Sequence, residues 1–440
     1  EAAWVIDTVY GTPGEEVTVP VYVDGASTLE VAGATFKITA NGADFAKVDA
    51  NSAAYGNAPI TNNGAAGATR LGGIIAGDVL FAITNCTNNA EGVIKNSGLL
   101  PGSSNLYAGG IAASDLAITN EDYAAYELKA ENCYVTNCHN KAEIIHDGTC
   151  KSIFLAGIVA RTTSATISNC TNTAAVKHLG VSTGNTYVAG ICGLQCNSVD
   201  KCTNSGAITL GGDNVPTSGY LYLSGLVGDV KGSITNCENS GAVTLKGDAN
   251  STTKFSTINV AGIARGSYGR IANTKNSGSI TVKDICASAL KVAGIVNMLY
   301  TTTDDYSKGE WKDVENSGNI TFDNVTGWTG NTNCYIGGLA SYILQSGSDL
   351  TAENRVELRN WTNKGNITTK NFVPGLASGE TGKEGRTILG GCFGHYTISW
   401  FDLNDCDNEG DINIEIAASS HTFIGGIAGF INQSATIADT

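Results

Sequence analysis

Short runs of alternating apolar and polar residues recur along the chain in one fixed order. In the stretch "ITNCENSGAVTL", residues 234–245, an apolar residue is followed three positions later by cysteine, and then by asparagine, glycine and valine at successive steps of two. Alternation with a period of two is typical of β-strands. Ten copies of the pattern align on an anchor residue, which is Ile60, Cys86, Cys138, Cys170, Cys202, Cys237, Thr274, Val314, Trp361 or Cys406.

The position two residues after the anchor is asparagine in every copy, and the position two further on is Gly or Ala. These asparagines are Asn62, Asn88, Asn140, Asn172, Asn204, Asn239, Asn276, Asn316, Asn363 and Asn408. A second anchor, a small residue followed by glycine and two further residues that are mostly apolar, alternates with the first. Its glycines are Gly73, Gly110, Gly157, Gly190, Gly225, Gly262, Gly294, Gly338, Gly391 and Gly426.

The spacing of the copies distinguishes between repeat architectures. The period is 32, 32, 35 and 37 residues in the middle of the chain and stretches to 40, 47 and 45 residues later. A propeller blade needs four strands of matched length, whereas a solenoid lets extra residues bulge from one edge. Neither a leucine-rich pattern nor a helical period is present. We therefore expect an all-β fold, a parallel β-solenoid of about ten coils over residues 57–440.

Stacking of equivalent residues explains the polar positions of the repeat. Successive coils of a parallel solenoid lie roughly 4.8 Å apart, so recurring asparagines form a ladder in which each amide bonds the next. A lone buried asparagine would instead cost about 1–3 kcal/mol if unsatisfied. The Gly or Ala that follows fits a bend where a larger side chain would clash, or where φ is positive. The residues expected in the ladder and in the core beside it include Asn172, Asn204, Asn239, Asn276, Asn316, Cys170, Cys202 and Cys237.

The thirteen cysteines allow two interpretations. Stacked Cys170 and Cys202 would come within disulfide range, since Cα separations of about 4.4–6.8 Å are compatible with a disulfide. We favour free thiols that act as small hydrophobic side chains, because Thr274, Val314 and Trp361 fill the same slot without sulfur. The cysteines do not form paired CxxC motifs and no histidine cluster accompanies them, which argues against a zinc module.

Composition and charge exclude several function classes. The chain has 55 glycines and only 15% charged residues, and it lacks the residues that surface helices use. Its formal net charge of −15, with no basic run, argues against nucleic-acid binding. No stretch of 18 apolar residues would span a membrane. The chain opens on Glu1 without Met or a signal peptide, so we expect that a leader was removed or that the chain was cut from a longer protein.

The segments "ITNCTNNAEG…YAGGIAA" and "ITNCENSGAV…VAGIA" resemble the GLUG-type repeats of bacterial cell-surface proteins, over about residues 57–440. The resemblance implies a right-handed, β-helix-like shaft of the kind found in secreted adhesins, and our fold prediction is accordingly a right-handed parallel β-solenoid (β-helix). That motif has no catalytic residues to carry over. The insertions after Gly294 are longer than such repeats usually show, which puts shaft-only behaviour in doubt.

Residues 1–56 lie outside the repeat. In "VIDTVYGTPGEEVTVPVYVDG" the apolar positions Val17, Val19, Val21 and Val23 alternate, and Pro20 is typical of an edge strand. This segment resembles the opening strands of cohesin-type β-sandwich modules over about 35 residues. We interpret residues 1–56 as an N-terminal β-strand cap or an assembly arm.

Candidate chemistry is sparse. Asp405, Asp407 and Glu409 alternate with Cys406 and Asn408, so they would share one side of a strand and could hold Ca²⁺, although a solvated outer face is the favoured interpretation. No other cofactor is expected. Trp328 and Trp400 lie outside the repeat slots and are candidates for a sugar or protein contact surface, with packing as the favoured alternative. The five histidines are scattered and no catalytic triad is detectable, so catalytic residues are predicted to be none.

The predicted function follows from the repeat and from its far end. Ile437 precedes Thr440 by three residues, so Thr440 falls on the anchor position of an eleventh copy and the chain has no capping coil. We expect a non-enzymatic secreted or cell-surface protein that acts as a rigid shaft, an adhesin or a fibre subunit associating head to tail. Expected partners are further copies through the solenoid ends, a glycan or a host or cell-surface protein. The alternative is a carbohydrate-binding or polysaccharide-degrading β-helix protein.

Overall fold

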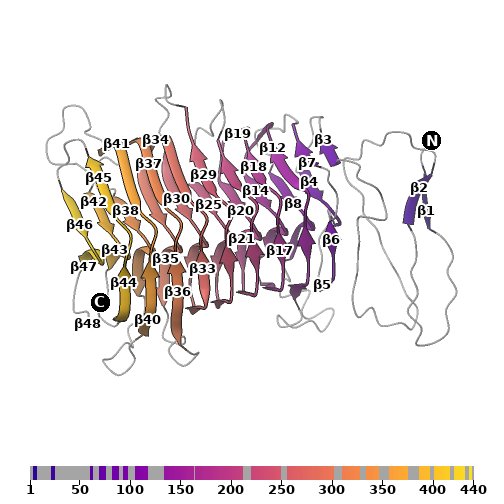
Figure 1. The fold of residues 1–440 in the computed structure, drawn as a ribbon. Coiled ribbons are helices and arrows are strands. Elements are labelled where there is room, and N and C mark those ends of the chain that lie inside the picture. The colour runs from indigo at the N-terminus through magenta and orange to yellow at the C-terminus, as the bar shows by residue number, and fades with distance from the viewer. Residues whose placement is uncertain are drawn as a thin grey trace.

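The computed structural model describes residues 3–6, 21–24, 60–62, 69–75, 82–88, 93–97, 105–116, 133–162, 164–211, 220–248, 255–301, 310–327, 333–345, 356–374, 386–396, 401–416, 421–431 and 436–438. The described residues form strands and connecting turns, with no helix among them. No helix in this part of the chain is therefore long and apolar enough to cross a membrane. From β3 onward the strands stack in parallel along one axis, as Figure 1 shows, which confirms the predicted parallel β-solenoid.

Each coil passes through a short corner strand and then a ladder strand. The corner sheet consists of β5 (Ala82–Thr84), β10 (Tyr134–Thr136), β16 (Thr166–Ser168), β22 (Ser198–Asp200), β27 (Ile234–Thr235) and β32 (Ile271–Ala272). The ladder sheet consists of β6 (Thr87–Asn88), β11 (His139–Asn140), β17 (Thr171–Asn172), β23 (Thr203–Asn204), β28 (Glu238–Asn239), β33 (Thr274–Asn276), β36 (Trp311–Asn316), β40 (Val356–Asn363), β44 (Phe401–Asn408) and β48 (Thr436–Ala438). In the coils of β36, β40 and β44 one long strand takes the place of the corner strand and the ladder strand.

The chain then enters a 19-stranded sheet, the long sheet, which it crosses in two rows. The first row contains β3 (Ile60–Asn62), β7 (Val93–Asn96), β12 (Glu143–His146), β18 (Val176–His178), β24 (Ile208–Leu210), β29 (Val243–Lys246), β37 (Ile320–Gly327), β41 (Ile367–Pro374) and β45 (Ile412–Ile416). The second row contains β4 (Thr69–Gly72), β8 (Leu106–Gly109), β14 (Ile153–Ala156), β20 (Thr186–Ala189), β25 (Tyr220–Ser224), β30 (Phe255–Ala261), β38 (Asn333–Gly337), β42 (Arg386–Gly390) and β46 (Thr422–Gly425). Strand β34 (Ile280–Ala293) runs through both rows.

After the glycine anchor the chain turns into the post-glycine sheet, which completes the coil. It consists of β9 (Ala112–Leu116), β15 (Val159–Thr162), β21 (Cys192–Cys196), β26 (Val227–Val230), β31 (Ala264–Ser267), β35 (Val296–Thr301), β39 (Ala340–Gln345), β43 (Phe393–Tyr396) and β47 (Ala428–Ile431). A small parallel pair, β13 (Thr149–Cys150) and β19 (Val181–Ser182), connects the two rows of the long sheet in two neighbouring coils.

Strands β1 (Ala3–Ile6) and β2 (Val21–Asp24) form an antiparallel pair outside the solenoid sheets, with Trp4 opposite Val23. The strand predicted around Val21 and Val23 is therefore present. The boundary at residue 56 stays a prediction, because β1 and β2 are the only described elements before it.

One copy of the repeat was placed in the wrong register by the sequence pattern. Ile60 and Asn62 lie opposite Ile94 and Asn96 in the long sheet, and not in the ladder sheet beside Cys86 and Asn88. An apolar residue followed two positions later by asparagine occurs both in the ladder sheet and in the first row of the long sheet. The short pattern alone therefore does not determine to which of the two sheets a copy belongs. The ladder therefore contains nine of the ten predicted asparagines, from Asn88 to Asn408.

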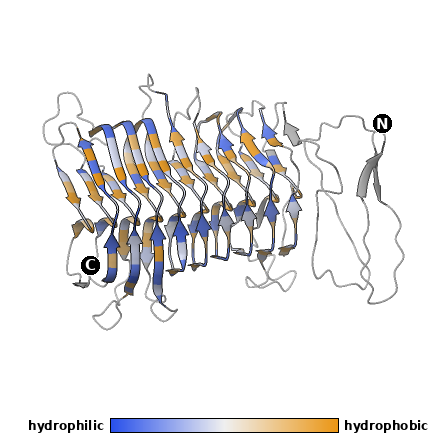
Figure 2. Ribbon diagram, in the orientation of Figure 1, coloured by the Kyte–Doolittle hydropathy of each residue, from blue (hydrophilic) through white to orange (hydrophobic). Residues whose placement is uncertain are grey.

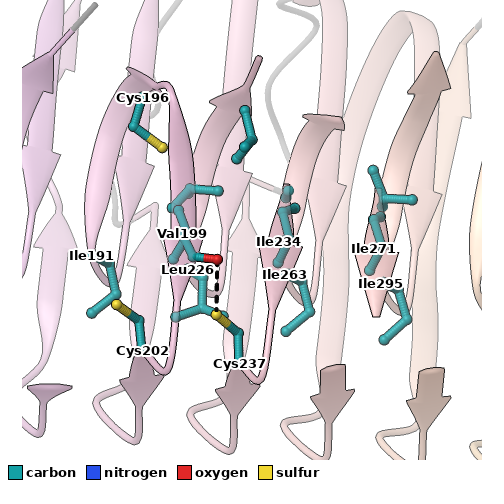
Figure 3. Packing of buried hydrophobic residues seen from close by; sticks show 14 of the residues in the cluster. Ile191, Cys196, Val199, Cys202, Leu226, Ile234, Cys237, Ile263, Ile271 and Ile295 are labelled. Carbon is teal, nitrogen blue, oxygen red and sulfur yellow. Dashed lines mark hydrogen bonds between the residues drawn. The ribbon is translucent and has the colours of Figure 1, made fainter. Parts of the chain in front are cut away.

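Two rows of apolar side chains face each other inside the coils. One row comes from the corner strands, where Ile167, Val199 and Ile234 lie in register. The residue after each anchor glycine supplies the other row, as Ile191 and Leu226 do. Both rows are buried except at the two ends of the second row, where Ile74 and Ile427 are partly buried. Figure 3 shows these rows one above the other, with Cys202 and Cys237 beside them. Alternating hydrophobic and hydrophilic positions along the strands are visible in Figure 2.

The residue directly before each ladder anchor has a left-handed backbone conformation, a feature that the sequence pattern did not reveal. It is Asn85, Asn137, Asn169, Lys201, Asn236, Asn273, Asp313, Asn360 or Asp405, with φ between 49° and 58°. Asn and Asp tolerate this conformation better than other residues with a β-carbon, because their short polar side chains bond locally. This residue turns the chain from the corner sheet into the ladder sheet. The Gly or Ala two residues after the ladder asparagine shows no such φ in the described coils. A β-carbon at Gly241 would lie 2.1 Å from the carbonyl oxygen of Gly206, so only the steric explanation holds.

The second-anchor glycines form a column in direct contact with the asparagine ladder. A β-carbon added to Gly225 would lie 1.9 Å from the carbonyl oxygen of Gly262 and 2.5 Å from the amide of Asn239. The same two contacts, with the next glycine of the column and with a ladder asparagine, recur from Gly73 to Gly391. The ladder amide therefore occupies the space that any side chain at this position would need.

We predict that Gly225→Ala lowers the free energy of unfolding by about 3 kcal/mol, because the added methyl group overlaps backbone atoms that cannot move independently. Gly426→Ala is the matched control, since a β-carbon at Gly426 meets no atom within 4 Å. That variant should stay within about 0.5 kcal/mol of the parent. Urea unfolding followed by circular dichroism measures both, and equal shifts in the two variants would contradict the proposed contact.

Candidate functional site

Nine asparagines, all buried except the partly buried Asn408, form a continuous hydrogen-bonded column along the solenoid. The Nδ2 of Asn172 donates to Oδ1 of Asn204 at 2.8 Å, and Asn204 donates in the same way to Asn239. The bonds continue to Asn408 at one end and begin at Asn88 at the other, with lengths of 2.8–3.2 Å. From Asn140 onward each Nδ2 also donates to the carbonyl oxygen two residues later, at 2.8–3.0 Å. From Asn140 to Asn363 both amide protons are therefore used, and the predicted ladder is confirmed.

The anchor cysteines form a second column beside the ladder. The Sγ of Cys237 donates to the carbonyl oxygens of Thr235 at 3.1 Å and Val199 at 3.7 Å. Thr274 takes the same position in the next coil, and its hydroxyl donates to the corresponding carbonyl oxygen of Ala272 at 2.9 Å. The cysteine and threonine copies of the slot thus bond a carbonyl oxygen in the same way, whereas Val314 and Trp361 fill it in later coils.

All thirteen cysteines are free thiols in the structure, and all but Cys286 are buried. Burial raises the pKa of the Cys150 and Cys406 thiols to about 12. Burial also raises the pKa of Cys237. Because the thiolate is the reactive form, Cys150, Cys237 and Cys406 are inert at neutral pH.

Two histidines are packed together inside neighbouring coils. His146 and His178 are 0% exposed, lie opposite each other in β12 and β18, and have their Nδ1 atoms 2.9 Å apart. The Nε2 atom of each ring has no hydrogen-bond partner among the described residues. Burial lowers the pKa of His146 to about 4, and burial together with the neighbouring ring lowers the pKa of His178 well below its usual value. Both rings are therefore neutral in the folded protein at pH 7.

Aromatic residues form a column on the outer side of the long sheet. Tyr107, Phe154 and Tyr187 lie in register, with ring centroids 4.8 and 4.9 Å apart and nearly parallel planes. Tyr222 continues the column, but its ring is tilted by 35° from that of Tyr187. Each of these residues stands three positions before an anchor glycine. An aromatic residue occupies this position in six of the ten copies, a signal that sequence analysis could have used: Tyr107, Phe154, Tyr187, Tyr222, Tyr335 and Phe423.

Charged side chains from the post-glycine sheet and from β34 of the long sheet reach the same outer surface. Arg265 of β31 forms an ion pair with Asp229 of β26, and its guanidinium group lies 4.8 Å from the ring centroid of Tyr222. The Nζ of Lys291 lies 5.7 Å from the ring centroid of Tyr342. This is the part of the described surface where aromatic, cationic and acidic side chains come together.

The sequence-predicted acidic site consists of exposed side chains. Asp405, Asp407 and Glu409 lie on or next to β44, while Cys406 between them is buried, as the alternation predicted. Asp405 belongs to the left-handed corner position. Within the described ranges no three His, Cys, Asp or Glu side chains are grouped so that they could hold a metal ion. Ca²⁺ binding at these carboxylates stays a prediction that this arrangement does not strengthen.

The two tryptophans proposed as a contact surface, Trp328 and Trp400, lie outside the described residues. Two other tryptophans lie in the core: Trp361 is 0% and Trp311 is 3% exposed. The indole Nε1 of Trp361 donates to the carbonyl oxygen of Trp311 at 3.1 Å, which satisfies its polar atom in the interior.

Comparison with known proteins gives one match. Residues 2–74, about a sixth of the chain, match the Cohesin domain family. The match supports the cohesin-like resemblance of the N-terminal segment, and it extends into β3 and β4, which pair with solenoid strands. No curated protein and no solved structure matches the chain. The resemblance of residues 57–440 to GLUG-type repeats stays a prediction.

We predict that Asn239→Ala lowers the free energy of unfolding by about 3 kcal/mol. The variant removes the bonds to Asn276 and Gly241 and leaves the neighbouring amides without partners in a buried position. Glu238→Ala on the same strand is the control, because Glu238 is exposed, and it should change stability by less than about 0.5 kcal/mol. Urea titration of both variants tests this, and a loss in Asn239→Ala no larger than in the control would refute the ladder's contribution.

We also predict that acid destabilises the protein through the buried histidines. The unfolded chain takes up protons near pH 6.5, whereas His146 in the fold resists protonation until about pH 4. The unfolded state therefore binds more protons, and the free energy of unfolding falls as the pH drops from about 6.5 to about 4. His146 alone accounts for about 3 kcal/mol at the lower end.

The double variant His146→Asn, His178→Leu tests this, because Asn96 and Leu210 occupy the same register positions in the adjacent coils. Unfolding at a series of pH values should show a smaller slope between pH 6.5 and 4 in the variant. His395, whose pKa burial also lowers to about 4, keeps part of the slope in both proteins. An unchanged slope would show that the pair is not responsible.

Proposed function

We propose that this chain is a non-enzymatic structural or adhesive protein of the cell surface or extracellular space, in which the solenoid acts as a rigid shaft. The observation that carries the proposal is the unbroken ladder from Asn88 to Asn408, which fixes each coil on the next. A column of satisfied buried amides resists sliding and bending, because any displacement exposes several polar groups at once. The solenoid is therefore expected to be rigid along its whole length.

The Cohesin match at residues 2–74 supports a role in protein-mediated attachment. A module that contacts other proteins at one end of a shaft is the arrangement expected of an adhesin or a scaffold subunit. Secretion and a protein partner belong to this proposal.

The solenoid's last described strands favour association along the axis. Ile424 is 49% exposed, although its register partner Leu389 is completely buried. Ile412, Ile414 and Ile416 are likewise only partly covered. A further coil, from the same polypeptide or from a second copy, would cover these side chains. Exposed edges of parallel sheets pair readily with another strand, so head-to-tail stacking is the form of self-association that we propose.

Electron microscopy of the purified chain at increasing concentration tests the proposal. We expect stiff rods, with end-to-end assemblies becoming longer as the concentration rises. The variant Ile414→Lys, Ile424→Lys should remain as single rods, because two charges in the open end oppose stacking. Flexible or globular particles would exclude the shaft. Rods that do not lengthen at any concentration would exclude self-association, and the proposal would then be limited to a monomeric adhesin.

The alternative is a carbohydrate-binding or polysaccharide-degrading β-helix protein. One observation supports carbohydrate binding. Half-buried tyrosines with nearby arginine, lysine and acidic groups line the outer face of the solenoid. Sites for polar ligands commonly combine aromatic walls with a few placed polar groups.

A further inference from the structure

The aromatic column on the outer side of the long sheet is interrupted at two consecutive coils. After Tyr222 the in-register positions are Asn259 and then Lys291, and the column resumes with Tyr335. Ile258 and Val260 on either side of Asn259 belong to the core, so the alternation of the strand directs Asn259 outward with its register partners. The result is a polar segment between two tyrosines, which we term the polar gap.

Two acceptor atoms in the polar gap have no donor in the protein. Asn259 is 2% exposed, and its Oδ1 lacks a hydrogen-bond partner. Asp229 is 8% exposed; Arg265 pairs with its Oδ2, while its Oδ1 has no partner. Buried polar atoms are normally satisfied, and an exception calls for an explanation. Both atoms would accept a hydrogen bond from a hydroxyl group.

One cation in the polar gap lacks a carboxylate partner. The Nζ of Lys291 contacts the sulfur of Met298 at 3.6 Å and lies near the ring of Tyr342, and no described acidic group pairs with it. The sulfur of Met298 also contacts Arg265, at 3.9 Å, so both cations converge on this atom. Burial lowers the pKa of Lys291, and the positive charge of Arg265 lowers it further. An anion placed between Lys291 and Arg265 would relieve both effects.

We propose that the polar gap binds an acidic sugar of the uronate type, presented as part of a polysaccharide that lies against the solenoid. The sugar's carboxylate pairs with Lys291, its hydroxyl groups donate to Asn259 and Asp229, and Tyr222 and Tyr335 border the site. Tyr222 and Tyr335 are three coil steps apart, roughly 14 Å at 4.8 Å per step, which leaves room for one or two sugar residues between them.

A peptide carrying acidic side chains is less suited to this surface. The strands under the polar gap are paired on both sides, so their backbone groups are already used and no edge is available for strand addition. Recognition must come from side chains alone, and the two unpaired acceptors suit a ligand with several donors close together. A sugar ring carries several hydroxyl donors beside its carboxylate, whereas the amide donors of an acidic peptide are spaced along its backbone.

The overall charge of −15 opposes polyanions, so the interaction must be local. At about 0.15 M salt the Debye length is about 8 Å, and charges elsewhere on the long shaft are largely screened from the polar gap. The proposal adds a ligand site to the shaft and does not depend on whether the shaft self-associates.

Isothermal titration calorimetry with polygalacturonate at about 0.15 M NaCl, with a chelator present, tests the proposal. We expect binding by the intact chain, and binding at least tenfold weaker, about 1.4 kcal/mol, to the methyl-esterified polymer, whose carboxylates are neutral. Lys291→Gln should weaken binding to polygalacturonate by the same factor or more. Lys275→Gln is the matched control, because Lys275 is exposed on the ladder sheet and its loss changes the net charge equally.

Asn259→Asp provides an independent variant, since it supplies Lys291 with a carboxylate from the protein itself. This variant should fold, because it pairs the buried cation, and it should lose polygalacturonate binding. The proposal is overturned if the intact chain does not bind polygalacturonate, or if Lys275→Gln weakens binding as much as Lys291→Gln does. Equal binding of poly-L-glutamate would also overturn it, because charge alone would then be sufficient.

Discussion

The hydrogen bond from one ladder asparagine to the next is the interaction on which the rest of the structure depends. A solenoid coil has a thin interior, and each buried amide in it must find partners for two donors and an acceptor. Asn204 meets this requirement only when Asn172 and Asn239 lie directly before and after it in the stack. A shift of one residue in any coil would move the asparagine to the opposite face and leave its neighbours unsatisfied. The ladder therefore fixes the register of each coil.

Other features of the repeat follow from this register. The anchor glycines are small because the ladder amides occupy the space beside them, as the contact between Gly225 and Asn239 shows. The left-handed residue before each anchor turns the chain so that the asparagine points inward, which explains the preference for Asn and Asp at this corner. The segments between the two anchors have no such constraint, so the period ranges from 32 to 52 residues without disturbing the stack.

The sequence was sufficient to predict the architecture, because identical residues recur where identical environments recur. The solenoid, the ladder and the inward cysteines could all be predicted from spacing. The register of Ile60 could not, because apolar-x-Asn occurs at two places in a coil. The polar gap was also missed: Asn259 and Lys291 gain meaning only as exceptions in an aromatic column, and Met298, which contacts Lys291 and Arg265, belongs to a different sheet from Lys291. Such contacts depend on side-chain paths that no linear pattern records.

Distances between spin labels along the ladder sheet test the in-register stack most directly. Thr171, Thr203 and Glu238 occupy equivalent positions in successive coils, and Asp407 occupies the same position further along the stack. Labels paired with Asp407 should give distances of roughly 29, 24 and 19 Å by double electron–electron resonance, falling by about 4.8 Å per coil. The account would be contradicted if the distance changed between successive coils in proportion to the number of residues that separate the labels. Distances that do not decrease in this order would also contradict it.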